Sequence, residues 1–293
     1  MVGVVTVTYN SAAVIDGFMK SMLSQLHQNF ILFIIDNASQ DKTLALLGGY
    51  DDSRIKIVSN RENVGVAEGN NQGIVAAIEA GCQFVLLINN DTEFDSNLMS
   101  EMILGAEAHD AEMLTPKIMF FEPSSIIWCA GGYFRPWLGY STCHYGEGQR
   151  DAPRFNLPRP IAYAPTCCML IAISVFKKIG LMDPRYFVYY DDTDFCWRAH
   201  KSGVRFWYDP RTTLYHKVSS LTGGGQSDFG IVYATRNKVY FALKNLGPLR
   251  VAYCLLVYQL IFIYKLLSGT DSRRTFVLKW RAYVSGIRHY LAR

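Results

Sequence analysis

Apolar and polar positions alternate along the first 120 residues in a pattern that predicts strands and helices in turn. Short runs rich in Val, Ile, Leu and Phe predict strands at residues 2–8, 30–35, 55–59, 84–88 and 113–119, and the continuous apolar run at 84–88 predicts a buried one. Between them, apolar residues with a helical period predict helices at residues 12–26, 41–47, 66–80 and 97–109. Strands that alternate with helices are typical of a mostly parallel sheet covered on both faces, so we expect an α/β fold.

The pattern changes in residues 121–160, where Pro and Gly are frequent and Trp and Tyr lie between them. We expect a long loop or an irregular hairpin region there, of the kind that often carries substrate recognition. Beyond it, the pattern predicts strands at residues 161–173 and 204–208, helices at residues 174–179 and 191–202, and a turn at Asp209-Pro210.

From about residue 228 the pattern is helical, and residues 249–267 are apolar except for Arg250, Gln259 and Lys265. This stretch of 19 residues is close to the roughly 20 that span a bilayer. Its polar interruptions and its Tyr residues favour a helix that lies in the membrane interface. A spanning helix, a buried core helix and a dimer contact remain alternatives.

The formal net charge of +4 is divided unevenly along the chain. Residues 1–235 carry 18 Lys and Arg against 24 Asp and Glu, whereas residues 236–293 carry 11 Lys and Arg against Asp271 alone. A basic, aromatic C-terminal part on an acidic body indicates an anionic partner for that part. The candidate partners are a phospholipid surface, a nucleic acid and a polyphosphate, and a merely solvated basic helix is the alternative.

Composition narrows the class of protein further. The 293 residues, half of them apolar, suffice for one large globular domain with an appendage. The seven Cys form no C-x-x-C pair, which argues against a zinc site or a disulfide framework and favours a reducing cytoplasm. We expect no secretion signal, because the chain starts with a predicted strand. Neither a G-x-G-x-x-G motif nor a P-loop lysine motif follows the first strand, which weakens dinucleotide-binding and ATP-binding interpretations.

Asp91 follows the predicted strand at residues 84–88, directly after Asn89 and Asn90. In open α/β sheets, ligands bind at the carboxyl ends of the strands. A carboxylate at this position suits a divalent cation that holds a diphosphate, because Mg²⁺ takes one or two carboxylates and completes its shell with phosphate oxygens and water. The alternative is that Asp91 caps the helix predicted to begin near Asn97.

A second acidic cluster, Asp191, Asp192 and Asp194, lies at the start of a predicted helix. Carboxylates this close repel one another unless a cation, hydrogen bonds or protonation relieve them. One interpretation is structural, since acids at a helix start meet the positive end of its dipole. The functional interpretation is a general base in a cleft, which takes the proton from an alcohol nucleophile as it attacks.

His216 is the third candidate, and it could complete the protein ligands of a metal bound at Asp91. A purely structural role for this single His remains the alternative. The run Gly223-Gly224-Gly225 shortly after it predicts either a mobile lid over bound substrate or an ordinary flexible linker.

Five motifs resemble, in their order and spacing, those of glycosyltransferase family 2, the inverting group with the GT-A fold. They are Thr8-Tyr9-Asn10, Ile35-Asp36-Asn37-Ala38-Ser39, Asn63-Val64-Gly65-Val66-Ala67, Asn90-Asp91 and Asp191-Asp192-Thr193-Asp194. Two later segments, at residues 186–192 and 215–220, look like the rhamnosyltransferase-like branch. The resemblance covers about residues 1–245. It implies a GT-A catalytic domain at residues 1–227, with a nucleotide-sugar half at about 1–120 and an acceptor half at about 121–227, followed by basic and apolar helices at 228–293 that associate with a membrane.

The resemblance also implies a role for individual residues on the donor side. Asp36 would recognise the nucleotide base, and the other residues near the nucleotide sugar would be Thr8, Asn10, Asn63, Gly65, Asn90 and Asp91. Asp91 matches the metal-binding acid of the family's D-x-D motif, and His216 matches a second ligand of Mg²⁺ or Mn²⁺. The chain departs from that motif at Asn89, which stands where the first Asp would be.

On the acceptor side, Asp192 matches the family's general base and Asp191 would lie beside it. Weaker matches, for acceptor or phosphate contacts, are Asp194, Trp197 and Arg198. The branch implies dTDP-rhamnose as donor, with UDP-sugars next, in surface polysaccharide assembly. The implied acceptor is a saccharide, on a lipid diphosphate or free, at the inner face of the cell membrane. An anionic membrane surface and a homodimer are further expected partners, and a nucleic acid is not. The alternative functions are a sugar-phosphate nucleotidyltransferase and a non-catalytic GT-A-like binding domain.

Overall fold

A ten-stranded sheet runs through the computed structural model, which describes residues 1–218 and 227–292. Its strands follow the order β10-β12-β6-β11-β4-β1-β2-β3, with β5 paired to β12 and β7 paired to β6. Their bounds are β1 Val2–Thr8, β2 Phe30–Asp36, β3 Ile55–Ser59, β4 Phe84–Ile88, β5 Thr92–Phe94, β6 Met113–Phe120, β7 Ile127–Cys129, β10 Arg159–Pro160, β11 Cys168–Ala172 and β12 Phe206–His216.

The strand directions bring six carboxyl ends to one edge of this sheet. β1, β2, β3 and β4 are parallel, and β6 and β12 are parallel to each other. β11 is antiparallel to both of its neighbours, β4 and β6, so these two strands point the same way. Consequently β1, β2, β3, β4, β6 and β12 all end at the same edge. The expected mostly parallel α/β sheet is confirmed.

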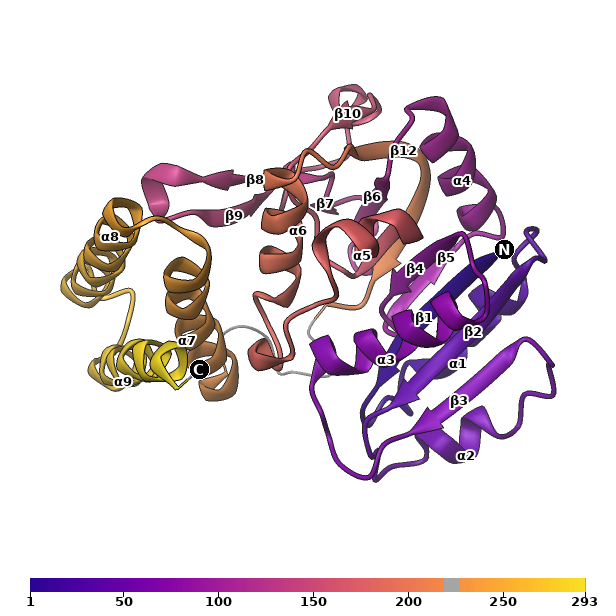
Figure 1. Ribbon diagram of the computed structural model, residues 1–293, viewed down its shortest axis with the longest axis horizontal. Helices are drawn as coiled ribbons and strands as arrows, with labels where there is room; N and C mark the ends of the chain where they lie inside the picture. The colour runs from indigo at the N-terminus through magenta and orange to yellow at the C-terminus, as the bar shows by residue number, and fades with distance from the viewer. Residues whose placement is uncertain (219–226, 293) are drawn as a thin grey trace.

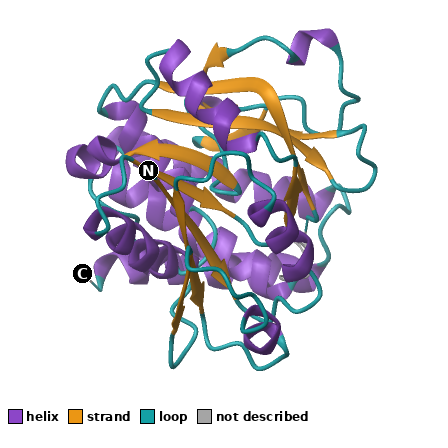
Figure 2. Ribbon diagram, turned by 90° about the vertical axis from the view of Figure 1, so that its right-hand side faces the viewer, coloured by secondary structure: helices purple, strands orange, loops and turns teal. Residues whose placement is uncertain are grey.

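Helices cover both faces of the sheet (Figures 1 and 2). The core on one face includes residues of α1 (Ile15–Leu23), α2 (Thr43–Leu47) and α4 (Leu98–Ala108). The core on the other face includes residues of α3 (Val66–Glu79), α5 (Ile173–Ile179) and α6 (Asp191–Lys201). Alternation along β1 explains this division, because Val4 belongs to the first core and Val5 to the second. Burial of each such side chain stabilises the fold by about 1.5–3 kcal/mol.

The segment predicted as a loop or an irregular hairpin contains a two-stranded hairpin that stands apart from the main sheet. Its strands are β8 (Gly132–Arg135) and β9 (Ser141–His144), joined through the short 3-10 helix η1 (Pro136–Leu138). A second 3-10 turn, η2 (Pro153–Phe155), follows it. Figure 1 shows the hairpin extending from the sheet toward the C-terminal helices.

Two predicted strands differ from those observed. The strand predicted at residues 161–173 is wrong for its first part, since β11 begins only at Cys168. The strand predicted at residues 204–208 continues to His216, so the turn predicted at Asp209-Pro210 is also wrong. The register between β12 and β6 shifts between Tyr208 and Thr213, which indicates a bulge there. Pro is tolerated at bulges, and the strand resumes beyond this one.

Three helices form the C-terminal part of the described chain, at the left of Figure 1. They are α7 (Asp228–Asn245), α8 (Pro248–Leu267) and α9 (Arg273–Leu291). Two of them begin at side-chain caps, since Ser227 accepts a hydrogen bond from Gly230 N and Ser272 accepts one from Thr275 N. The predicted lid or linker at residues 223–225 lies outside the described residues.

Candidate active site

A cavity of about 420 Å³ opens at the sheet edge where β1, β4 and β12 end. Polar side chains from segments far apart in the sequence line this cavity. Its walls include Asn90, Asp91, Tyr163, Asp191, Asp192 and His216. The fold therefore brings the two predicted acidic segments and the predicted His into one cavity.

Strand pairing places Asp91 beside His216. β5 runs antiparallel to the end of β12, with Thr92 opposite His216 and Glu93 opposite Tyr215. The Nε2 atom of His216 then lies 3.2 Å from Oδ1 of Asp91, and both side chains are buried. The helix-capping alternative for Asp91 is wrong, because the N-cap position of α4 is Asn97.

These residues fit a divalent cation. Two neighbouring ligand atoms of an octahedral Mg²⁺ lie about 3.0 Å apart when each is about 2.1 Å from the ion. The 3.2 Å between Asp91 Oδ1 and His216 Nε2 is compatible with one ion bound by both. Within residues 1–218 and 227–292, Asn90 Oδ1 is also buried with no hydrogen-bond partner, so it is a further polar atom at this place. The described residues contain no group of three or more His, Cys, Asp or Glu placed to hold one metal ion, so donor phosphates or water would have to complete the shell.

Asp191 and Asp192 form the acidic wall of the cavity, in the first turn of α6. Burial and the neighbouring Asp192 carboxylate raise the pKa of Asp191 to about 8, and burial also raises the pKa of Asp192. Tyr163 donates a hydrogen bond of 3.0 Å to Oδ2 of Asp192, and Thr193 N donates one of 2.6 Å to its Oδ1. The Asp192 carboxylate is therefore fixed in orientation and holds its proton more strongly than an exposed one.

An aromatic wall connects the Asp91–His216 pair to Asp192. The Trp128 ring lies 4.4 Å from the His216 ring and 4.8 Å from the His144 ring, measured between centroids. His144 in turn stacks on Tyr163 at 5.8 Å. Burial lowers the pKa of His144, which keeps its ring neutral at neutral pH. Sequence reasoning did not assign Trp128, His144 or Tyr163 to the site, because no motif marks them.

The segment before Asp191 has an unfavourable backbone conformation. Phe187, Tyr189 and Tyr190 have φ of 64°, 61° and 69°, a region that side chains other than Gly rarely adopt. Such residues cost of order 1–3 kcal/mol each and persist where the surroundings enforce them. Here the enforcing residue is Asn237 of α7, which is fully buried. Its Nδ2 lies 2.8, 2.7 and 2.8 Å from the carbonyl oxygens of Tyr186, Val188 and Tyr189.

The donor-side residues lie at the same edge of the sheet, at the ends of β1 and β2. Asp36 is fully buried, and its carboxylate accepts hydrogen bonds from the hydroxyls of Thr8 and Ser39 and from Ser39 N. Asn10 Oδ1 accepts from Gln40 N. These hydrogen bonds hold the side chains in place at this edge of the sheet. That these residues bind a nucleotide stays a prediction.

Asn63 and Gly65 order the next segment, at the start of α3. Asn63 Oδ1 accepts a hydrogen bond from Gly65 N, and Gly65 has φ of 86°. A Cβ at Gly65 would lie 2.5 Å from the carbonyl oxygen of Phe187, so only Gly allows the two segments to touch. This contact joins the donor-side edge to the segment before the acidic pair.

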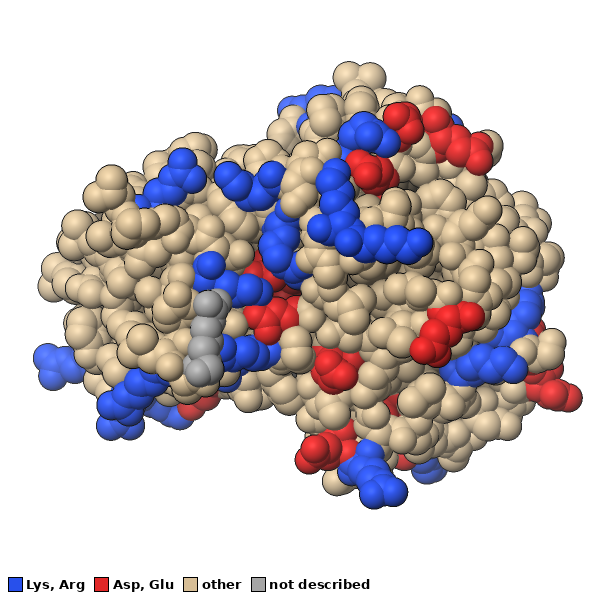
Figure 3. Space-filling view, viewed as in Figure 1, with Lys and Arg blue, Asp and Glu red and all other residues tan. Residues whose placement is uncertain are grey.

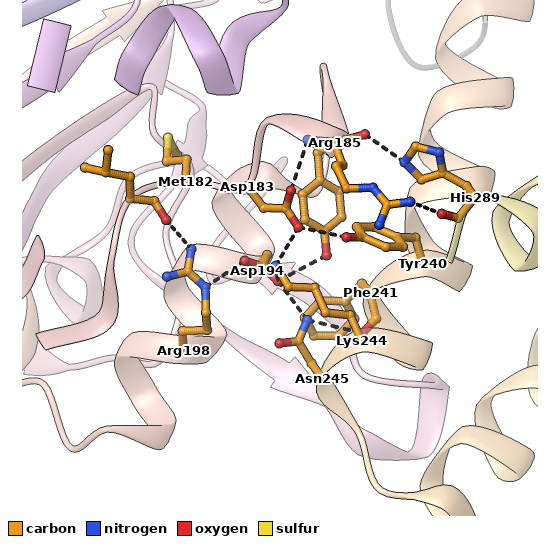
Figure 4. A network of polar contacts seen from close by, with 12 residues as sticks. Met182, Asp183, Arg185, Asp194, Arg198, Tyr240, Phe241, Lys244, Asn245 and His289 are labelled. Carbon is orange, nitrogen blue, oxygen red and sulfur yellow. Dashed lines mark hydrogen bonds and ion pairs between the residues drawn. The ribbon is translucent and has the colours of Figure 1, made fainter. Parts of the chain in front are cut away.

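Asp194, Trp197 and Arg198 do not belong to the described cavity lining. Asp194 is fully buried and accepts from Arg198 Nε at 2.8 Å, Lys244 Nζ at 2.9 Å and Asn245 Nδ2 at 2.8 Å (Figure 4). The Trp197 ring packs against Phe134, at a centroid distance of 5.0 Å. In this arrangement the three residues fasten α6 to α7 and to the hairpin, and their predicted contact with acceptor or phosphate stays untested.

Comparison with known proteins identifies the family. A family model described as "Glycosyl transferase family 2" matches residues 3–180. The chain is 26% identical over 190 residues to a low-salt glycan biosynthesis hexosyltransferase of Haloferax volcanii, covering 64% of this chain and 58% of that protein. It is 20% identical to a dTDP-rhamnosyl transferase of Shigella flexneri, covering 97% of this chain and 94% of the relative. A Mycobacterium tuberculosis N-acetylglucosaminyl-diphospho-decaprenol L-rhamnosyltransferase is 22% identical, covering 84% and 87%.

Solved structures share the fold. The structure of GalNAc-T7 with UDP, GalNAc and Mn²⁺ matches with a TM-score of 0.63 at 14% identity, covering 83% of this chain and 47% of that one. The structure of TarS from S. aureus with UDP-GlcNAc matches with a TM-score of 0.59 at 15% identity, covering 99% of this chain and 81% of that one. At these identities the likeness shows the GT-A fold alone.

Proposed function

Because the chain belongs to glycosyltransferase family 2, we propose that it moves one sugar, with inversion, from a nucleoside-diphosphate sugar to a hydroxyl of a saccharide acceptor. One observation carries this proposal. The Asp91–His216 pair and Asp192 line a single cavity, so groups suited to a leaving diphosphate and to an attacking hydroxyl face the same space. The two alternative classes, a nucleotidyltransferase and a non-catalytic domain, gain no support from this arrangement.

In this proposal the residues of the cavity have two separate functions, one at the leaving diphosphate and one at the attacking hydroxyl. Asp91 and His216 would hold the cation, which neutralises the negative charge that develops on the departing diphosphate. Asp192 takes the proton of the acceptor hydroxyl as that hydroxyl attacks the anomeric carbon. Tyr163 and Thr193 N, which donate to the Asp192 carboxylate, aim it at the cavity.

A single displacement of this kind inverts the anomeric centre, and it needs no covalent glycosyl-enzyme. The second carboxylate, Asp191, therefore need not act as a nucleophile. Retaining glycosidases differ, because their second carboxylate forms a covalent intermediate with the sugar. Burial and the Asp192 charge raise the pKa of Asp191 to about 8, so Asp191 is the carboxyl of the pair that keeps a proton at neutral pH.

The relatives support a proposal for the substrates. One is named for dTDP-rhamnose transfer and another for rhamnose transfer to a decaprenol diphosphate saccharide. We therefore propose dTDP-rhamnose as donor, with a UDP-sugar as the next candidate. The proposed acceptor is a saccharide on a lipid diphosphate, which places the enzyme on the inner face of the cell membrane.

The donor can be identified without knowing the acceptor. A ligand present at about 100 times its Kd stabilises the native state by about 2.7 kcal/mol, which corresponds to a rise in Tm of roughly 5–10 °C for a chain of this size. We expect dTDP-rhamnose with Mn²⁺ or Mg²⁺ to give the largest rise in a panel of nucleoside diphosphates and their sugars. The control is dTDP alone, which reports the nucleotide contribution. A panel in which no sugar nucleotide raises Tm would contradict the proposed donor class.

Asn237 offers a test of how the base is held. We expect Asn237→Ala to lower kcat about tenfold or more, because Val188 O and Tyr189 O lose the amide that donates to them and displacements near 1 Å can impair catalysis on this scale. KM for the donor should change little. Steady-state kinetics and urea unfolding measure the two effects. The matched control is Asn245→Ala on the same helix, whose amide bonds to Asp194 and to Phe241 O instead. An Asn237→Ala enzyme with unchanged kcat but reduced stability would show that the segment is held by other contacts.

A further inference from the structure

One face of α8 is apolar and exposed. Its outward residues recur with a helical period and are between 44% and 87% exposed: Leu249, Tyr253, Leu256, Leu260, Ile263, Tyr264 and Leu267. The opposite face, with Cys254, Tyr258 and Phe262, is buried against α7 and α9. Among the described helices, α8 is the one long and apolar enough to cross a membrane. Because one face is packed against the protein, α8 is suited to lie in an interface rather than to span it.

The tip of the β8–β9 hairpin continues this apolar face. Trp137 is 62% exposed and lines, with Leu249, Arg250 and Tyr253, a cleft of about 330 Å³ between the tip and α8. The Tyr253 hydroxyl donates to Trp137 O at 3.0 Å, and the Tyr258 hydroxyl donates to Gly139 O at 2.6 Å. The tip and the helix are thus held together as one surface. Trp and Tyr are the residues that concentrate at the level of lipid headgroups.

The C-terminal part of the chain is predominantly basic. Residues 246–293 contain eight Lys and Arg and a single acid, Asp271, which is paired with Lys279 at 2.6 Å. Arg250 lies beside the apolar face, in the lining of the cleft, and Arg273 and Arg274 at the start of α9 are also exposed, Arg274 being paired with Asp228 of α7. In Figure 3, the lobe at the left shows Lys and Arg around an uncharged surface and very little Asp or Glu.

We propose that the α8 face and the hairpin tip together form a docking surface for a bilayer of acidic phospholipid, with α8 lying in the plane of the interface and Trp137 inserted beside it. Apolar burial and basic charge are the two components that such binding requires. A second copy of the chain would cover the apolar face equally well, but it would bring a second set of cations against the first.

The hairpin gives this surface a connection to the cavity. β9 ends at His144 in the cavity wall, and Gly132 of β8 bridges to Tyr163, the partner of Asp192. Docking through the tip therefore fixes the height of the cavity wall above the bilayer. This consequence rests on the proposed lipid-linked acceptor, whereas docking itself does not.

Sedimentation of the full chain with vesicles tests the surface without any transfer reaction. We expect binding to vesicles of phosphatidylcholine and phosphatidylglycerol that is at least tenfold stronger than to phosphatidylcholine alone. Leu260→Glu and Trp137→Ala should each weaken binding roughly tenfold, because each removes an exposed apolar side chain from the contact. The matched control is Leu26→Glu, which changes a Leu of similar exposure outside the surface and should bind like the wild type. Thermal unfolding confirms that each variant is folded.

Several outcomes would overturn the proposal. If Trp137→Ala binds as the wild type does, the hairpin tip is not part of the surface. If Leu26→Glu weakens binding as much as Leu260→Glu, the contact is not localised. If the chain does not bind vesicles but forms a dimer, and if Leu260→Glu dissociates that dimer, the apolar face of α8 is a contact between two copies of the chain. Transfer to a soluble saccharide distinguishes the docking surface from the proposed glycosyl transfer. If the chain does not bind vesicles but still transfers sugar to a soluble saccharide, only the docking surface is refuted.

Discussion

Asp192→Asn is expected to lower transfer about 10²–10⁴-fold, the usual contribution of a general base. The amide keeps the shape of the carboxylate and can still accept the hydrogen bond from Tyr163, but it has no basic lone pair for the acceptor proton. Donor binding should stay close to that of the wild type. Single-turnover transfer together with a donor titration measures the two effects separately.

The pH dependence provides the control for this assignment. Burial raises the pKa of Asp192, and burial with the Asp192 charge raises that of Asp191 to about 8, so the pair retains a proton into the neutral range. Only the deprotonated base is active, and wild-type transfer should therefore rise with pH through the raised pKa of Asp192 and level off above it. Asp191→Asn resembles the protonated form of Asp191 and should leave this rise in place, since burial is the first cause of the raised pKa of Asp192. Near-normal turnover of Asp192→Asn, or a wild-type profile without this rise, would refute Asp192 as the base.

Asp91→Ala is expected to cost about a thousandfold in transfer, because metal stabilisation of a leaving group is worth several kcal/mol and about 1.4 kcal/mol corresponds to tenfold. The variant should also lose the metal-dependent part of nucleotide binding, which calorimetry with Mn²⁺ and a nucleoside diphosphate measures independently of turnover. His216→Ala should act in the same direction.

The matched control for the metal is Glu93→Gln. Glu93 is a carboxylate two positions away on β5, and it pairs with Lys217 outside the described cavity lining. This variant should keep both metal-dependent binding and transfer. Full wild-type activity in excess EDTA, or metal-dependent binding unchanged in Asp91→Ala, would remove the cation from the mechanism.

The parallel half of the sheet could be predicted from local pattern. β1, β3 and β4 begin and end at the predicted residues, because each is a short segment rich in Val, Ile, Leu or Phe between polar turn residues. The same pattern predicted that Asp91 lies at the carboxyl end of a strand. It could not show that Asp91 meets His216, because that contact depends on the pairing of β5 with β12. The resemblance to a family supplied this link, and the structure is consistent with it.

The acceptor half was less predictable for a physical reason. Trp128, His144 and Tyr163 come from short strands and loops without a clear period, and they meet through ring packing and a 3.2 Å hydrogen bond between His144 Nδ1 and Trp128 O. Likewise, nothing in the sequence near Asn237 indicates a target for its amide. Its partners are backbone carbonyls, which every residue has, so residue type alone could not have identified this contact.

The support that Asn237 gives to the segment before Asp191 has a consequence for synthesis of the chain on the ribosome. Domains form from the N-terminus as the chain emerges, at about 5–20 residues per second. The strands β1, β2 and β4 of the donor-side edge have all been synthesised by residue 88, and Asn90 and Asp91 follow directly. The segment before the proposed base, Asp192, gains its hydrogen bonds from Asn237 only after α7 has emerged. A nascent chain that ends before α7 therefore has the strands of the donor-side edge but lacks this support for its proposed base.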